Sequence, residues 1–100
     1  IGRLMLEPSS RSVRIGEAEP QHLTQLEFRL LYTLMTHPGQ VLTSEFIVDS
    51  VWGYSDSGNR DLVRGLVKRL RGKIEEEPKN PVYIRTISGV GYQFENPGAV

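Results

Sequence analysis

No cysteine occurs in this chain of 100 residues, and it has neither a net charge nor a long apolar run. Without cysteine it cannot form a disulfide, a thiolate metal site or a cysteine nucleophile, so a reducing compartment suits it. Its longest apolar runs are three residues, such as Phe46-Ile47-Val48, too short for a membrane span or a signal peptide. We therefore expect a cytoplasmic protein with no membrane contact.

The length and the hydrophobic content of 38% are enough for one domain with its own core, and too little for two. We expect residues 1–100 to form this single domain. The sequence starts with Ile1 and not with Met, so we expect the domain to be a fragment of a longer protein.

The zero net charge conceals an uneven distribution. Twelve Lys and Arg balance twelve Asp and Glu, but six bases and only one acid, Asp61, lie within residues 60–73, a local charge of +5. The six bases are Arg60, Arg64, Lys68, Arg69, Arg71 and Lys73. Such a segment favours an anionic partner, so we expect an electrically polarised molecule.

The first third of the chain predicts strands and then a helix. Residues 1–22 show short apolar alternation around a turn at Pro8-Ser9-Ser10, which is typical of a small antiparallel meander. Thr24-Gln25-Leu26-Glu27 has the pattern of a capping box and predicts the start of a first helix, which His37-Pro38-Gly39 ends.

The rest of the chain predicts two more helices and a hairpin. A second helix begins at Thr43-Ser44-Glu45 and ends at Gly53, and a third covers about residues 60–75. Residues 82–87 and 92–95 are β-rich runs separated by Ser88-Gly89-Val90-Gly91, which indicates a hairpin.

The third helix has one apolar and one basic face. At 100° per residue its large apolar residues lie within an arc of about 140°, which suits a core-facing helix. The opposite arc holds Gly65 and Gly72 among the bases, and each glycine costs a helix about 1 kcal/mol relative to alanine. Close approach of DNA in the major groove would explain glycine there. The alternative is a basic face that only keeps the protein solvated.

The predicted element order is that of a winged helix: helix, turn, helix, loop, basic helix and hairpin. Three strings resemble the OmpR/PhoB family of bacterial response-regulator effector domains: LTQLEFRLLYTLMTHPGQVLTSEFIVDSVWG (23–53), RLRGKIE (69–75) and PVYIRTISGVGYQF (81–94). The chain departs from the family at Val63-Arg64-Gly65-Leu66-Val67, where members usually carry Val-Asp-Val-His-Ile. The bases read by the third helix therefore cannot be transferred from the family.

The resemblance implies an α+β fold, a winged helix-turn-helix with a four-stranded amino-terminal antiparallel sheet, three helices and a carboxy-terminal β-hairpin wing. It also implies sequence-specific binding of double-stranded DNA at directly repeated half-sites, within a two-component transcriptional response regulator. The third helix would enter the major groove and the wing would lie beside the minor groove. An amino-terminal receiver domain, absent from this sequence, and an RNA polymerase contact at Tyr54 to Asn59 are further implications.

The predicted DNA-binding residues are Arg60, Arg64, Gly65, Lys68, Arg69, Arg71, Lys73, Arg85, Thr86 and Gly89. Arg69 and Arg71 match DNA-contacting positions of the family. The alternatives are an ion pair of Arg71 with Glu75, one of Arg85 with Glu95, and simple solvation of the remaining bases. We also expect Glu75 to Glu77 to be solvated, and Gly89 and Gly91 to supply backbone angles that other residues resist.

Nothing in the sequence predicts an enzyme or a cofactor. It has no nucleophile triad and no phosphate-binding glycine loop, and His22 and His37 lack further ligands at metal-binding spacing. The main alternative to DNA binding is a winged-helix module that binds another protein and never DNA.

Overall fold

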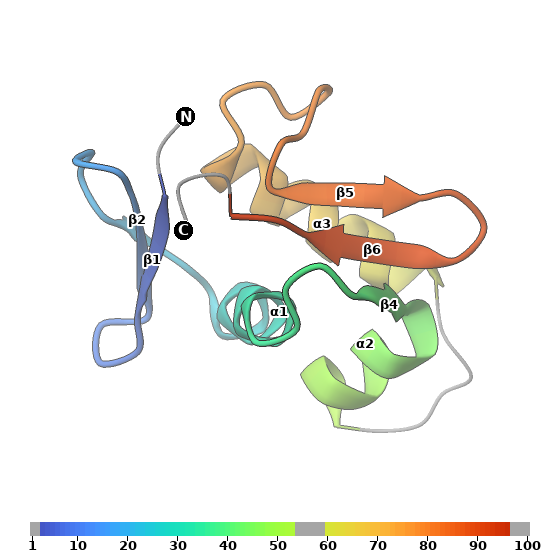
Figure 1. Cartoon of the computed structure of the whole chain (residues 1–100). Coiled ribbons are helices and arrows are strands. Elements are labelled where there is room, and N and C mark those ends of the chain that lie inside the picture. The colour runs from blue at the N-terminus through green and yellow to red at the C-terminus, as the bar shows by residue number, and fades with distance from the viewer. Residues whose placement is uncertain (1–2, 54–59, 97–100) are drawn as a thin grey trace.

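The computed structural model describes residues 3–53 and 60–96, which form an α+β domain of two small sheets and three helices (Figure 1). In chain order the elements are β1 (Leu4–Glu7), β2 (Ser12–Ile15), β3 (Gln21–His22), α1 (Gln25–Met35), β4 (Val41–Thr43), α2 (Ser44–Trp52), α3 (Arg60–Ile74), β5 (Ile84–Ile87) and β6 (Gly91–Phe94). The predicted order of strands, three helices and hairpin is confirmed.

Both sheets are antiparallel, and each has three strands within the described residues. The amino-terminal sheet has the order β1-β2-β3, and Leu4 pairs with Ile15 in its first ladder. The second sheet has the order β4-β6-β5. The expectation of four amino-terminal strands is therefore wrong for these residues: the chain's fourth strand, β4, pairs with β6 and joins the hairpin to the helices.

The helices begin where the sequence predicts them. The Thr24 hydroxyl accepts a hydrogen bond from the Glu27 N–H at 3.2 Å, and the Thr24 N–H donates to Glu27 Oε1 at 2.9 Å, which completes the capping box. Thr43 caps α2, which ends at Gly53 in the left-handed conformation. The sequence also predicts that Ser57 or Asn59 caps the start of α3, and both residues lie outside the described part of the chain.

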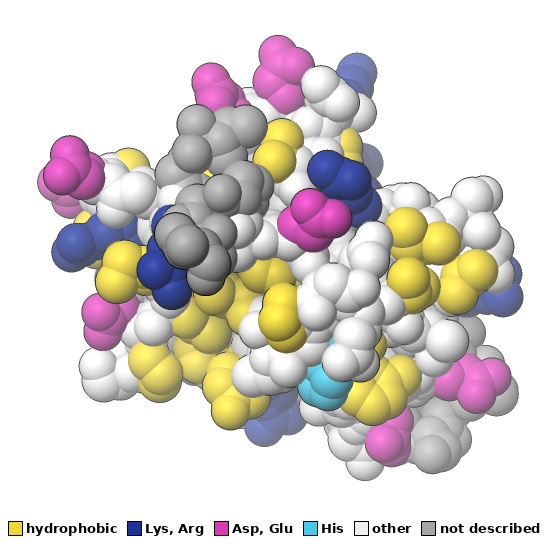
Figure 2. All heavy atoms as spheres, in the orientation of Figure 1, with side chains coloured by type: hydrophobic (Ala, Val, Ile, Leu, Met, Phe, Trp, Pro, Cys, Tyr) yellow, Lys and Arg dark blue, Asp and Glu magenta, His cyan; other side chains and the backbone are white. Residues whose placement is uncertain are grey.

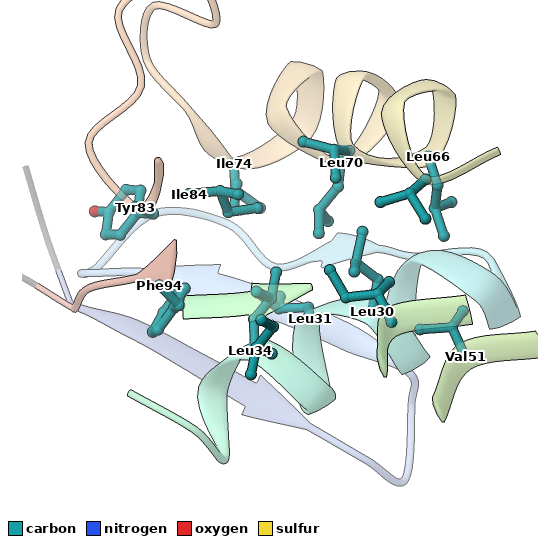
Figure 3. Packing of buried hydrophobic residues seen from close by; sticks show 14 of the residues in the cluster. Leu30, Leu31, Leu34, Val51, Leu66, Leu70, Ile74, Tyr83, Ile84 and Phe94 are labelled. Atoms are coloured by element: carbon teal, nitrogen blue, oxygen red, sulfur yellow. The ribbon is translucent and has the colours of Figure 1, made fainter. Parts of the chain in front are cut away.

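The core lies between α3, α1 and the second sheet. Figure 3 shows Leu66, Leu70 and Ile74 of α3 pointing toward Leu30 and Leu31 of α1. All of these side chains are buried, and Phe94 and Ile84 close the core from the hairpin. The apolar face of α3 is thus fully used inside the domain, and only its basic face is available to a partner.

The hairpin is shorter at its first strand than predicted. It starts at Ile84 and not at residue 82, and the N–H groups of Val82 and Tyr83, which precede it, donate to the Glu75 carboxylate. Its second strand starts at Gly91, one residue earlier than predicted.

Candidate nucleic-acid interface

The outward face of α3 presents basic side chains around a glycine. Arg60, Arg64, Lys68 and Arg69 are exposed, and a Cβ added at Gly65 would meet no atom within 4 Å. Within the described part of the chain, the side chains of Lys68 and Arg69 have no hydrogen-bond or ion-pair partner. This face therefore holds uncompensated positive charge, and no contact with a described residue requires glycine at position 65.

One base of this face has an acidic neighbour on the same helix. Arg64 Nη1 lies 3.3 Å from Asp61 Oδ1, and the two side chains are 72% and 89% exposed. Such exposed pairs are worth about 0–1 kcal/mol, since water screens them. The pair would open easily if a phosphate group approached Arg64.

A hollow of about 250 Å³ separates the start of α3 from the hairpin. Arg60 and Arg64 line it on the helix side, residues 86–92 line it on the hairpin side, and Ser44 of α2 completes it. Two cations and several hydroxyl and backbone groups therefore surround a concave surface beside the exposed face of α3. Phosphate groups are bound by such groups in protein complexes with DNA.

Arg71 lies on α3 but is directed into the protein. Its Nη2 donates to the Ile84 carbonyl oxygen and to Thr86 Oγ1, each at 2.8 Å, and its Nε donates to the same carbonyl at 3.2 Å. Burial lowers the pKa of Arg71 relative to that of a solvated guanidinium. The structure thus gives Arg71 hairpin partners in place of the suggested ion pair with Glu75.

Lys73 is likewise engaged inside the domain. Its Nζ lies 2.6 Å from Glu27 Oε1 and also donates to the His22 carbonyl oxygen at 3.1 Å. Glu27 is only 3% exposed, so this pair is a link between α3 and the start of α1. The six bases of the segment therefore divide into an outward group of four and a group of two with internal partners.

Of the hairpin residues of the predicted site, Thr86 and Gly89 line the hollow beside α3, whereas Arg85, next to Thr86 in β5, lies on the opposite face of the strand. Arg85 and Thr86 are exposed on β5, and Arg85 Nη1 lies 3.9 Å from Glu95 Oε1, so the suggested ion pair with Glu95 exists. Gly89 has φ +75° at the hairpin tip, as predicted for a residue with an unusual backbone angle.

The sequence predicts glycine at position 91 for an unusual backbone angle, and this reason is wrong. Gly91 has no positive φ. A Cβ at this position would lie 1.9 Å from the Leu42 carbonyl oxygen, so glycine is required by the close approach of β4.

The prediction that Glu75 is solvated is also wrong. Glu75 is 6% exposed, and its carboxylate accepts hydrogen bonds from the N–H groups of Val82, Tyr83 and Ile84 at 2.8–3.0 Å. Sequence reasoning missed this role. The available signal was its spacing four residues after Arg71, which places both on one side of α3.

The other charged surfaces are less suited to an anion. Figure 2 shows the side of the hairpin that faces away from α3, where Lys and Arg side chains are scattered among acidic and hydrophobic ones. A second hollow, about 270 Å³, is lined by Glu75, Glu76 and Glu77 and would repel phosphate. The outward face of α3 is therefore the better candidate for a polyanion.

Residues 3–53 and 60–96 have neither a cluster of metal ligands nor a membrane-spanning helix. They contain no group of three or more His, Cys, Asp or Glu residues placed to hold a metal ion. No helix among them has the length and apolar character needed to cross a membrane. The predicted polymerase contact at residues 54–59 lies outside the described part of the chain.

Comparison with known proteins agrees with this geometry. Residues 18–94 match the family described as "Transcriptional regulatory protein, C terminal". The alkaline phosphatase synthesis transcriptional regulatory protein PhoP of Bacillus subtilis is 39% identical over 97 residues, which are 97% of this chain and 40% of PhoP. The chain thus spans about two fifths of the length of this curated relative.

Solved structures show the same fold. The Klebsiella pneumoniae RstA DNA-binding domain, in complex with the RstA box, has a TM-score of 0.83 and 30% identity, with 94% of this chain and 92% of that one covered. The response regulator DrrB of Thermotoga maritima, described as an OmpR/PhoB homolog, has a TM-score of 0.81 and 33% identity over 96% of this chain and 43% of its own. The chain therefore belongs to the carboxy-terminal domains of transcriptional regulatory proteins, the OmpR/PhoB type of response-regulator effector domain.

Proposed function

We propose that this domain binds double-stranded DNA in a sequence-specific manner as the effector domain of a two-component transcriptional response regulator. The observation that carries the proposal is the outward face of α3, where Lys68 and Arg69 have no partner among residues 3–53 and 60–96 and a Cβ at Gly65 would meet open space. The B-DNA major groove admits one α-helix, and long basic side chains reach phosphates and guanine acceptors from it. The related RstA DNA-binding domain, whose structure was solved in complex with the RstA box, supports DNA binding by this chain.

The proposed DNA contacts come from two elements, α3 and the hairpin. Arg60, Arg64, Lys68 and Arg69 supply the α3 contacts, and Gly65 allows the groove wall to approach the helix. In the hairpin, Thr86 and Gly89 line the hollow next to this surface, and these two residues together with Arg85 supply contacts to the backbone or the minor groove. The internal bonds of Arg71 and Lys73 favour a supporting role over the DNA contact predicted from the sequence.

The proposal extends to the protein that contains this domain. We infer that residues 1–100 are one domain of a cytoplasmic response regulator, whose phosphorelay input comes from a receiver domain outside this sequence. The match to only 40% of PhoP supports a longer protein. Binding to directly repeated half-sites and an RNA polymerase contact through Tyr54 to Asn59 complete this proposal and rest on the family resemblance.

Selection of duplexes from a random pool by the 100-residue chain tests the function. We expect a recurring sequence that is enriched over successive rounds. Replacing Arg69 with alanine should weaken binding to that duplex by about 1–3 kcal/mol, because one base or phosphate contact is lost. Lys79→Ala is the matched control, since Lys79 is an exposed base outside α3 and the hairpin. No enrichment, or equal effects of the two substitutions, would contradict the proposal.

A further inference from the structure

The outer edge of β5 is bound by one side chain of α3 and by one from the residue that follows α3. In the sheet order β4-β6-β5, β5 is the last strand, and its Ile84 pairs with Phe94 of β6. Successive residues of an antiparallel strand direct their backbone groups to opposite edges. The Tyr83 carbonyl oxygen accepts from the Glu95 N–H, and the polar groups of Ile84 face the other way, toward α3.

The two backbone groups of Ile84 are bound by the side chains of Arg71, in α3, and of Glu75, the residue directly after α3. Arg71 donates to its carbonyl oxygen at 2.8 and 3.2 Å, and Glu75 Oε2 accepts from its N–H at 2.9 Å. Arg71 and Glu75 are four residues apart and so lie on one side of the helix. They replace the strand that β5 lacks on this edge, and we call them the edge brace.

The guanidinium of Arg71 extends along the hairpin. Its Nη2 also donates to Thr86 Oγ1 at 2.8 Å, and its Cζ lies 5.8 Å from the centroid of the Tyr92 ring on β6. One planar group therefore contacts two residues of β5 and an aromatic ring of β6. A lysine at this position would keep the charge but could not reproduce the fork of bonds.

The edge brace sets the distance between α3 and the hairpin, on which DNA binding by both elements depends. Arg60 and Arg64 line the hollow between α3 and the hairpin, and Thr86, a partner of Arg71, lines the same hollow. We propose that Arg71 is a positioning residue, which with Glu75 holds the hairpin at the distance from α3 that lets both elements contact one DNA duplex. The guanidinium itself contacts no DNA. This inference rests on the proposed function.

The first test needs no DNA. Amide hydrogen exchange is measured by NMR on the wild-type chain and on Arg71→Lys and Arg71→Ala. We expect the Ile84 amide and the amides of β5 and β6 to exchange about tenfold faster or more in both variants, because the hairpin opens more often once Arg71 no longer binds the Ile84 carbonyl oxygen and the Thr86 hydroxyl. Amides of α1 report whether the fold is intact and should keep their rates. Unchanged hairpin exchange in both variants would overturn the proposal.

The second test uses the duplex selected by the wild-type chain, whose enrichment by itself establishes or refutes DNA binding. If Arg71 positions the hairpin, Arg71→Lys should bind about tenfold more weakly, much like Arg71→Ala. At saturating protein it should still protect the same guanine N7 atoms from dimethyl sulfate, because α3 remains in the major groove. Wild-type affinity of Arg71→Lys, or loss of a specific guanine protection, would show a direct contact of Arg71 and overturn the proposal.

Discussion

Lys73 Nζ lies 2.6 Å from Glu27 Oε1 and so joins α3 to the first turn of α1 across 46 positions of sequence. The same ammonium donates to the His22 carbonyl oxygen, and Glu27 also accepts from the Thr24 N–H. The carboxylate is buried and has both a charged and a backbone donor. This pair therefore fixes the start of α1, and His22 two residues before its cap, against the end of α3.

The Glu27 carboxylate should make stability depend on acidity. Burial raises its pKa, but the hydrogen bonds from Lys73 and Thr24 and the charge of Lys73 outweigh burial, so its pKa lies below the ordinary value of 4.5. Ionised Glu27 therefore stabilises the fold above pH 4.5, and this contribution is lost as the pH falls through the lowered pKa. Glu27→Gln should reduce the free energy of unfolding at neutral pH by about 1–3 kcal/mol.

Urea denaturation measured across the acidic range checks this prediction. The wild-type chain should lose more stability than Glu27→Gln when the pH is lowered below 4.5. The matched control is Glu76→Gln, because Glu76 is exposed. If Glu27→Gln and the wild type lose the same amount of stability, the ion pair does not contribute as argued.

The same substitution should have opposite effects at two glycines. Gly65→Ala should stabilise the domain by about 1 kcal/mol, because alanine favours the helix and its Cβ meets open space. Gly91→Ala should destabilise it by about 1–3 kcal/mol, because its Cβ would meet the β4 backbone. The measurement is urea denaturation: the midpoint of unfolding should shift, and the dependence of the free energy of unfolding on urea should stay unchanged. A neutral Gly91→Ala would mean that β4 can move away at little cost.

A larger side chain at Gly65 should separate stability from DNA binding. We expect Gly65→Leu to stabilise α3 and yet to weaken binding to the selected duplex by tenfold or more, about 1.4 kcal/mol, through a clash with the groove wall. Gly72→Leu places the same side chain two turns later, where α3 is bound to the hairpin and α1, and should have the smaller effect. Equal or tighter binding by Gly65→Leu would refute close approach at this residue.

Arg85 should contribute to affinity without contributing to specificity. If its guanidinium leaves Glu95 for a phosphate, Arg85→Ala should weaken all duplexes nearly equally and reduce the slope of log affinity against log salt by about 0.9. Glu95→Gln, which removes the partner 3.9 Å away and keeps the cation, should not reduce that slope. An unchanged slope in Arg85→Ala would leave the ion pair as the only role of Arg85.

The features that are encoded locally could be predicted from the sequence. The capping box at Thr24 and Glu27, and the apolar spacing of α3 from Val63 to Ile74, involve residues within a few turns of each other, so their spacing alone indicates the structure. The hairpin was predicted to within a few residues because its turn signal is local.

The remaining features depend on contacts between distant segments. Arg71 and Lys73 look like any other base of α3 in the sequence, and only the positions of β5 and α1 show that their charges have internal partners. Gly91 is a glycine because β4 passes it, and β4 is almost fifty residues earlier in the chain. Neither helical spacing nor turn chemistry contains that information.

The most direct test of the central claim is a salt titration of the wild-type chain on the selected duplex and on a scrambled duplex, followed by fluorescence anisotropy. If the outward face of α3 and the hairpin bind DNA, log affinity should fall linearly with log salt, with a slope of about −0.9 for each phosphate contacted. The selected duplex should bind about a thousandfold more tightly than the scrambled one, or better still. A flat salt dependence with equal weak binding to both duplexes would contradict the account and favour a winged-helix domain that binds another protein.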